Sequence, residues 1–299
     1  MSPPACVGRF APSPTGPLHL GSLLAAAGSY LDARHAGGRW LLRIEDLDAP
    51  RVVAGAESRI LATLEACGFE WDGAILRQST RLDAYRAALE RLTREGHLFE
   101  CSCSRRELAD AAGGAVEGGS AYPGSCRRGP LHAGPTATRF RVPDGAVTLD
   151  DRVQGRVQFA WPALGDVVVQ RRDGVIAYQL AVVVDDAWQG ITDVVRGADL
   201  LDSTPWQTAL GQALHAPPLR YAHLPLVVEA DGRKLSKSRR AIGIDAAAAG
   251  SALWQVLALL GLAPPATLRG APPAELWAWG IPRWSLGPLR GRRSVPARE

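Results

Sequence analysis

The only two lysines of the chain, Lys234 and Lys237, lie three positions apart, and all the other basic residues, of 34 in total, are arginines. Both belong to the segment KLSKS (234–238), which follows an apolar run and an Asp-Gly turn signal. A lysine ammonium is a compact, mobile point charge, and a serine hydroxyl donates a hydrogen bond. The segment therefore suits a pyrophosphate leaving group. The alternative interpretation is a solvated basic loop.

A second candidate for phosphate binding is a proline- and glycine-rich loop that follows the apolar residues 5–11. Gly16 and Gly21 would let a large flat ligand approach the backbone closely. Apolar residues recur at helical spacing after His19, so this imidazole stands at a helix start, where free N–H groups and the helix dipole favour phosphate. His19 could donate hydrogen bonds to phosphoryl oxygens. Taken alone, the pattern is equally consistent with a turn and a helix-capping histidine.

Three of the five cysteines, Cys101, Cys103 and Cys126, fall within 26 residues. An odd number of cysteines argues against a disulfide framework. Zinc takes thiolates in a tetrahedral site of four ligands, so a further residue would have to complete a site made by these three. His132 is a possible fourth ligand. The alternative is three reduced cysteines without a metal.

Strand-like and helix-like patterns alternate along most of the chain, which predicts a parallel sheet with right-handed crossovers. Residues 98–170 interrupt this rhythm with the cysteines, a Gly/Ala-rich stretch and short alternating segments, and so indicate an insertion. The α/β pattern returns with an apolar run at 175–185 and with Val194–Arg196. We expect strands at 5–11, 39–47 and 224–228, and helices from His19 to Gly37, at 56–67, 80–95, 202–215 and 246–262.

These patterns predict an α/β fold: a doubly wound, parallel-sheet, nucleotide-binding (Rossmann-like) catalytic domain, an inserted α+β zinc-containing subdomain and a small C-terminal helical piece. The two halves of the catalytic domain are expected at 1–97 and 171–240, the insertion at 98–170 and the C-terminal region at 241–299. The tail from residue 263 is rich in proline and tryptophan, and its end has a composition compatible with disorder.

The order and context of HLGS (19–22) and KLSKS (234–238) resemble the class I aminoacyl-tRNA synthetases, whose signatures read His-Ile-Gly-His and Lys-Met-Ser-Lys-Ser. The last residue of the first signature is Ser22 here. The resemblance implies that His19, Lys234 and Lys237 act in catalysis and that Mg²⁺ accompanies ATP. The ATP contacts that it implies are Pro12, Gly16, His19, Gly21, Ser22, Lys234, Ser236 and Lys237.

The segments GRFAPSPTG (8–16), RIEDLDAPR (43–51) and DVVRGADLL (193–201) resemble glutamyl-tRNA synthetases, and the resemblance covers about residues 5 to 240. Glutamate has two carboxylates and one ammonium. Arg9 and Arg196 could pair with carboxylates and Glu45 could accept from the ammonium, although either arginine could instead form a structural ion pair. The glutamate contacts that the resemblance implies are Arg9, Phe10, Ala11, Pro12, Ser13, Glu45, Tyr178 and Arg196.

In this family a tyrosine four residues before the last cysteine often binds the zinc, and Tyr122 has that spacing from Cys126. The resemblance thus implies one structural Zn²⁺ held by Cys101, Cys103, Tyr122 and Cys126. Tyrosine is an unusual zinc ligand, so His132 stays open as a substitute.

After Ser238 only 61 residues remain, too few for the large anticodon-reading domains of a full glutamyl-tRNA synthetase. The chain therefore resembles the short paralogues called glutamyl-queuosine tRNA(Asp) synthetases. That implies activation of L-glutamate with ATP in the absence of tRNA and transfer to the queuosine base in the anticodon of tRNA(Asp). The alternatives are a truncated glutamyl-tRNA synthetase that charges an acceptor end and a non-catalytic RNA-binding paralogue.

The formal net charge of +4 and the pI of about 9.0 fit an RNA partner without requiring one. No apolar run of about 18 residues and no signal-peptide pattern occur in the sequence. We therefore expect a cytoplasmic enzyme without a membrane partner, and a monomer.

Overall fold

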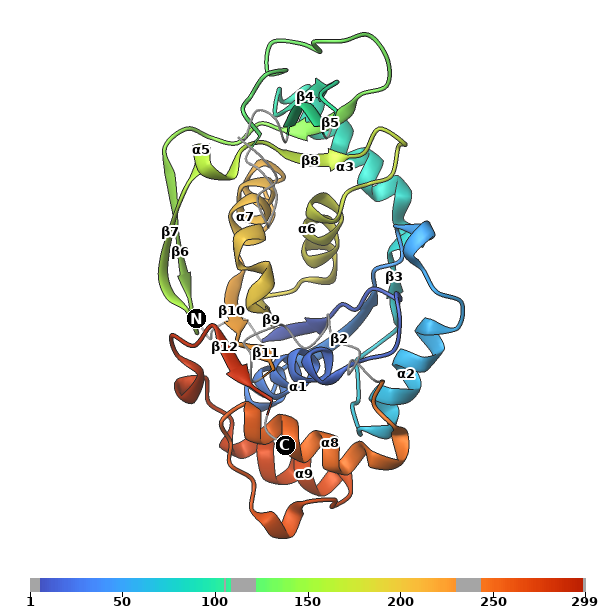
Figure 1. Ribbon diagram of the computed structural model, residues 1–299, viewed down its shortest axis with the longest axis vertical. Helices are drawn as coiled ribbons and strands as arrows, with labels where there is room; N and C mark the ends of the chain where they lie inside the picture. The colour runs from blue at the N-terminus through green and yellow to red at the C-terminus, as the bar shows by residue number, and fades with distance from the viewer. Residues whose placement is uncertain (1–5, 105, 109–121, 230–242, 298–299) are drawn as a thin grey trace.

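The computed structural model describes residues 6–104, 106–108, 122–229 and 243–297 (Figure 1). Its centre is formed by two groups of parallel strands, β1–β2–β3 and β9–β10. The backbone N–H of Thr192 donates to the carbonyl oxygen of Val7 at 3.0 Å, so β9 lies beside the free edge of β1. The resulting order, β3–β2–β1–β9–β10, is that of a doubly wound sheet. The bounds are Val7–Phe10, Arg39–Ile44, Leu76–Arg77, Asp193–Gly197 and Arg220–Leu224 for β1, β2, β3, β9 and β10.

Helices lie on both sides of these strands, with α1 on one side and α6 and α7 on the other (Figure 1). The apolar run at 175–185 forms most of α6, whose middle part, from Leu180 to Asp186, is largely buried because it packs against α3 and α7. The prediction of an α/β fold with a parallel sheet is confirmed. The helices of this part are α1 Leu20–His35, α2 Ala56–Ala66, α3 Leu82–Arg94, α6 Tyr178–Gln189 and α7 Thr204–Ala213.

Helix α1 fits its position for local reasons. His19 caps its N-terminus, and Arg34 and His35 lie in the last turn, where cations interact favourably with the helix dipole. A Cβ atom on Gly28 would lie 2.4 Å from Cδ1 of Leu224, so a larger residue here would have to displace the buried Leu224 side chain of β10.

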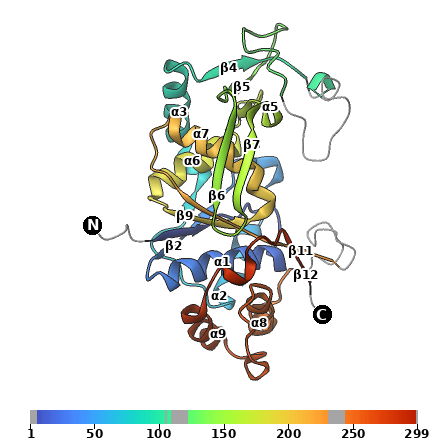
Figure 2. The same ribbon diagram turned by 90° about the vertical axis from the view of Figure 1, so that its left-hand side faces the viewer.

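The insertion consists mainly of antiparallel strands. Strands β4 (Leu98–Cys101), β5 (Ala137–Phe140) and β8 (Val167–Gln170) form one sheet in the order β4–β5–β8. Strands β6 (Ala146–Asp151) and β7 (Gly155–Ala160) form a long hairpin, followed by the short helix α5 (Trp161–Leu164). The hairpin runs back along the molecule toward the central strands (Figure 2), where the backbone N–H of Arg152 donates to the carbonyl oxygen of Tyr221 at 2.9 Å.

The C-terminal segment packs onto the first half of the fold. Helices α8 (Ala249–Leu259) and α9 (Pro273–Gly280) share a hydrophobic cluster with α1. Within it the Trp277 ring contacts the rings of Tyr30 and Phe69, with centroids 4.8 and 5.0 Å away.

The expectation that the end of the tail is disordered is wrong as far as residue 297, because β12 (Ser294–Pro296) pairs with β11 (Leu226–Val228). Within the described ranges, no helix is both long and apolar enough to cross a membrane. Short 3-10 helices occur at Ala49–Arg51, Gln78–Arg81, Ala198–Ser203, Ala246–Ala248, Ala266–Leu268, Ile281–Arg283 and Gly287–Leu289.

Candidate functional site

A cavity of about 1060 Å³ opens at the carboxyl ends of the parallel strands. Residues that follow β1, β2, β9 and β10 line it, which places it where the strand order reverses between β1 and β9. Such switch points are where open α/β sheets bind ligands. Every described residue that we expected to contact glutamate or ATP lines this cavity, namely Arg9, Phe10, Ala11, Pro12, Ser13, Gly16, His19, Gly21, Ser22, Glu45, Tyr178 and Arg196.

His19 caps α1 with its own side chain. Its Nδ1 accepts from the backbone N–H of Ser22 at 3.2 Å, and its Nε2 lies 3.1 Å from the Ser22 hydroxyl. Because Nδ1 accepts, a neutral ring carries its proton on Nε2. A Cβ atom on Gly21 would lie 3.1 Å from Cε1 of His19, so the absence of a side chain at Gly21 makes room for the imidazole. We had expected it to make room for a ligand. Gly16 borders open space.

Lys234, Ser236 and Lys237 lie outside the described residues. The chain on either side of them reaches the cavity. Val227 lines it just before the gap, and after the gap the backbone N–H of Ile244 donates to the carbonyl oxygen of Leu18 at 3.1 Å.

Two buried arginines, one of which lines the cavity, share one carboxylate. Nη2 of Arg43 donates to Oδ1 of Asp186 at 2.8 Å, and Nε of Arg9 lies 3.4 Å from the same oxygen. Burial opposes ionisation of Asp186, but Arg43 and Arg9 hold its pKa below the usual value. Arg9 thus forms the structural ion pair that we had left open as an alternative to ligand binding. It also lines the cavity.

Glu45 is a nearly buried carboxylate with an unused oxygen. Its Oε1 lies 3.5 Å from Nε of Arg43 and has no hydrogen-bond partner among the described residues. Burial raises the pKa of Glu45 to about 7, because desolvation outweighs the attraction of Arg43 and Arg9. Glu45 also lines the cavity, so its carboxylate could accept a hydrogen bond from a ligand ammonium.

Arg196 is held differently from Arg9. Its Nη1 donates to the Tyr178 hydroxyl at 3.3 Å, its Nη2 to the Thr204 hydroxyl at 2.8 Å and its Nε to Nε2 of His223 at 3.1 Å. These partners are neutral, and no carboxylate of the described chain forms an ion pair with it. Its charge is therefore left for a ligand carboxylate.

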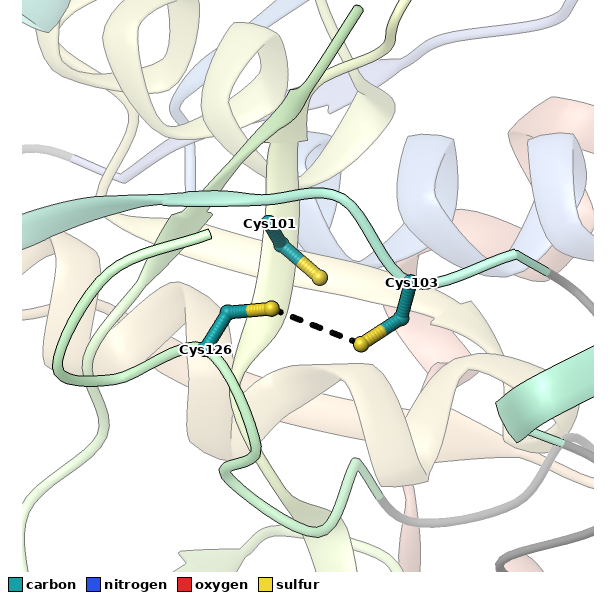
Figure 3. A group of neighbouring side chains, drawn as sticks. All are labelled: Cys101, Cys103 and Cys126. Carbon is teal, nitrogen blue, oxygen red and sulfur yellow. Dashed lines mark hydrogen bonds between the residues drawn. The ribbon is translucent and has the colours of Figure 1, made fainter. Parts of the chain in front are cut away.

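The three clustered cysteines converge. Their sulfur atoms point toward one another (Figure 3) and lie within 4.8 Å of one another, with 3.5 Å between Cys103 and Cys126. The Tyr122 hydroxyl lies 3.6 Å from the sulfur of Cys101 and accepts from the backbone N–H of Cys126 at 2.6 Å. This donor set fits one soft metal ion such as zinc. His132 contacts Glu107 at 2.6 Å instead, with its side chain half exposed.

The thiols of this cluster differ in pKa. Burial alone would raise the pKa of Cys126, but hydrogen bonds from the backbone of Ser102 and Leu131 and from Tyr122 lower it to about 6. Burial raises the pKa of Cys103 to about 12. A thiolate is thus favoured at one corner of the cluster.

A second group of neighbouring potential metal ligands, Cys6, Asp32 and Asp193, belongs to an ion-pair network. Arg152 lies 2.6 Å from Asp32 and Arg220 lies 2.7 Å from Asp193, so the carboxylates already have cationic partners. We assign no metal to it.

Residues 5–265 match the family described as tRNA synthetases class I (E and Q), catalytic domain. The chain belongs to this family. Among curated relatives, the Glutamyl-Q tRNA(Asp) synthetase of Pseudomonas paraeruginosa is 52% identical over 291 residues, covering 97% of each chain. The protein of the same name from Dechloromonas aromatica is 54% identical over 282 residues, covering 93% of this chain and 94% of that protein.

Solved structures of the family agree with the fold. The glutamate-tRNA synthetase of Elizabethkingia anophelis is 27% identical with a TM-score of 0.80, over 97% of this chain and 68% of that one. A glutamate tRNA ligase from Elizabethkingia meningosepticum, solved in complex with its amino acid, is 26% identical with the same TM-score, over 98% of this chain and 67% of that one.

Within this class I synthetase fold, our sequence reasoning missed the residues that hold the arginines, Asp186 and His223. One signal was available for Asp186: two adjacent acids, Asp185 and Asp186, interrupt the apolar run that becomes α6. Both are buried, and a buried carboxylate requires cationic or hydrogen-bonding partners. For His223 the sequence offers no comparable signal.

Proposed function

We propose that this chain activates L-glutamate with ATP, without tRNA, and transfers the glutamate to the queuosine base in the anticodon of tRNA(Asp). The observation that carries the proposal is a cavity at the switch point of the sheet that is lined by both Arg196 and Glu45. Among the described residues, Arg196 forms no ion pair with a carboxylate, and one oxygen of Glu45 has no hydrogen-bond partner. Opposite charges in one cavity match an amino acid with an acidic side chain. The names of the curated relatives, which are 50–54% identical, support the acceptor.

Glutamate would lie between these groups. Arg196, with the Tyr178 hydroxyl beside it, would bind one carboxylate, and Arg9 would contribute positive charge for the other. Glu45 would accept from the ammonium. Residues 10–13 would also contact the glutamate. The backbone N–H of Glu45 donates to the carbonyl oxygen of Pro12 at 3.0 Å and so holds this loop beside Glu45.

ATP would occupy the part of the cavity near the start of α1, where Pro12, Gly16, His19, Gly21 and Ser22 lie. An oxygen of the glutamate α-carboxylate attacks the α-phosphorus in line, the bond to the β-phosphate oxygen breaks, and pyrophosphate leaves. His19 would donate Nε2–H to a phosphoryl oxygen. Lys234, Ser236 and Lys237 would stabilise the leaving pyrophosphate, and Mg²⁺ bound with ATP would supply further positive charge.

The second step needs no covalent enzyme intermediate. A ring hydroxyl of queuosine attacks the carbonyl carbon of glutamyl-adenylate, the bond to AMP breaks, and an ester forms. The proposed enzyme is a cytoplasmic monomer. We retain the division into 1–97 and 171–240 for the catalytic domain, 98–170 for an α+β insertion and 241–299 for a C-terminal helical region.

We also propose that the insertion binds one structural Zn²⁺. Three converging thiols and the Tyr122 hydroxyl support this set of four ligands, Cys101, Cys103, Tyr122 and Cys126. The ion would tie the end of β4 to the loop that carries Cys126. His132 is the weaker candidate because it is engaged by Glu107.

The decisive experiment transfers labelled glutamate, with ATP, to tRNA(Asp) that contains or lacks queuosine. Label only on the queuosine form supports the proposal. Label on the acceptor end of a tRNA would identify a truncated glutamyl-tRNA synthetase instead. If neither RNA is labelled while glutamate-dependent pyrophosphate exchange proceeds, activation stands and the acceptor is wrong. Absence of exchange as well would indicate a non-catalytic paralogue.

A further inference from the structure

Behind Arg196 lies a buried pair, Asp151 and His223, to which the proposed function assigns no role. Nδ1 of His223 lies 2.6 Å from Oδ2 of Asp151, and Nε2 of the same ring lies 3.1 Å from Nε of Arg196. The side chains of Asp151 and His223 are at most 1% exposed. A continuous chain of contacts thus leads from the insertion, through one imidazole, to an arginine of the cavity.

The hydrogen-bond pattern fixes the protonation of this chain. The other oxygen of Asp151, Oδ1, accepts from the backbone N–H groups of Val153, Gln154 and His223 at 2.9, 2.8 and 3.1 Å. An oxygen that accepts three N–H groups belongs to an ionised carboxylate, so Oδ2 accepts as well and the ring proton is on Nδ1. Nε2 then offers a lone pair to the guanidinium of Arg196, whose groups can only donate.

The electrostatics agree with this assignment. Burial opposes ionisation of Asp151, but the hydrogen bonds from His223 and the backbone keep its pKa below the usual value. Burial lowers the pKa of His223. The hydrogen bond to Asp151 acts in the opposite direction and the positive charge of Arg196 in the same one, and the pKa stays below its usual value. The ring is therefore neutral at physiological pH.

We propose that Asp151 and His223 are positioning residues for glutamate recognition: Asp151 fixes the tautomer of His223, and the neutral imidazole orients Arg196 without neutralising its charge. This inference rests on the proposed function. Arg9 and Arg43 illustrate the alternative, since both contact the carboxylate of Asp186 directly. At Arg196 the imidazole of His223 lies between the guanidinium and the carboxylate of Asp151. The guanidinium is therefore oriented by a neutral group, and its charge stays available for a carboxylate of glutamate.

The position of Asp151 gives the insertion a part in substrate recognition. Asp151 is the last residue of β6, in the hairpin that extends from the insertion to the central strands (Figure 2). Its contact with His223 spans 72 positions of the chain. The hairpin therefore completes the support of a residue in the glutamate site.

The test is Asp151→Asn, which is nearly isosteric and keeps an oxygen for the three backbone N–H groups. The new amide N–H would donate to Nδ1 of His223, so the ring proton would move to Nε2 and face the N–H of Arg196. An aspartate-to-asparagine change beside a histidine imposes the wrong tautomer in this way in serine proteases. Nε of Arg196 would then lose its acceptor, while its Nη groups would keep Tyr178 and Thr204.

Two readouts follow. In long-range ¹H–¹⁵N spectra of histidine-labelled protein, with His223 assigned by its loss in His223→Gln, the wild type should show Nδ1–H and Asp151→Asn should show Nε2–H. In glutamate-dependent pyrophosphate exchange, Asp151→Asn should raise KM for glutamate at least tenfold and leave KM for ATP unchanged. A merely structural role would lower kcat through loss of active protein and leave both KM values in place.

Asp193→Asn is the matched control. It removes a buried carboxylate from β9, the strand of Arg196, but Asp193 pairs with Arg152 and Arg220 outside the cavity. KM for glutamate should stay at the wild-type value. An Nε2–H tautomer in the wild type, or an unchanged KM for glutamate in folded Asp151→Asn, would overturn the inference. No exchange in the wild type would contradict the proposed function and the glutamate role together, while the spectra would still decide whether Asp151 sets the proton of His223.

Discussion

Nε of Arg43 lies 3.5 Å from Oε1 of Glu45, and neither atom has a hydrogen-bond partner among the described residues. Arg43 is fully buried, and its two Nη atoms donate to Gln189 and Asp186. Buried polar atoms without partners are costly, and they call for an explanation where they occur in a native fold. Glu45 lines the cavity, and a substrate ammonium there would offset part of the cost of burying its carboxylate.

Glu45→Gln should stabilise the free protein at alkaline pH. The folded pKa of about 7 exceeds the ordinary value of 4.5, so the folded state binds more protons between these values and the free energy of unfolding falls as pH rises through this window. The two values imply that about 3 kcal/mol is lost by pH 8. In urea unfolding, the free energy of unfolding of Glu45→Gln should exceed that of the wild type at pH 8 but not at pH 4.5.

The exposed Glu90 provides the control, since Glu90→Gln should not change this pH dependence. In exchange assays Glu45→Gln should also raise KM for glutamate, because the amide cannot replace the negative charge that faces the ammonium. Equal stability of Glu45→Gln and wild type at pH 8 would refute the buried-carboxylate interpretation.

Lys237→Ala should lower pyrophosphate exchange by about two to three orders of magnitude, the usual effect of removing one group that stabilises transition-state charge. The fold should be intact by circular dichroism. Lys237→Arg should recover only part of the rate, because the planar guanidinium does not replace a compact ammonium. Near-normal exchange in Lys237→Ala would exclude the proposed role.

Cys126→Ser should reduce bound zinc below one ion per chain by elemental analysis, with a lower melting temperature. Tyr122→Phe should weaken zinc retention against a chelator, because it removes the fourth proposed ligand but keeps the ring. His132→Ala should leave the zinc content unchanged. The opposite result for the last two variants would make His132 the fourth ligand, and zinc-free wild-type protein would contradict the site.

Trp277→Ala should destabilise the protein by about 3–5 kcal/mol, the usual effect of removing a large buried aromatic side chain. Trp277 is 4% exposed and its indole N–H donates to the carbonyl oxygen of Cys67 at 2.9 Å. Trp188→Ala, at a tryptophan that is 64% exposed, is the comparison and should cost far less. Denaturant midpoints will distinguish them, and similar losses in both variants would argue against a C-terminal segment anchored by Trp277.

The parts of the fold that the sequence predicted depend on local periodicity. The first strand, the helix after His19 and the strand around Leu42 lie within a few residues of their expected positions, because alternation and helical spacing are properties of short segments. The predicted glutamate residues came from the resemblance to the synthetase family. Together with the predicted ATP residues that the structure describes, they line one cavity at the carboxyl ends of the parallel strands.

The residues that escaped prediction are those whose role depends on distant partners. Arg43 and Asp186 are 143 positions apart, and nothing near Arg43 in the sequence identifies the acid that it binds. The end of the tail was misjudged for a related reason. Its composition is compatible with disorder, but β12 pairs with β11, and Trp284 is buried in the cluster that contains α1.

The place of β1 between β2 and β9 has a consequence for synthesis. Val7 contacts Thr192 across 185 positions of the chain, whereas only helix α1 separates β2 from β1. At about 5–20 residues per second, a ribosome needs roughly 10–40 s to supply the missing neighbour. During that interval the nascent chain presents an open strand edge, which is a template for pairing with other chains. The growing polypeptide is thus most exposed to aggregation before residue 193 emerges, and chaperones that bind extended segments would act in this interval.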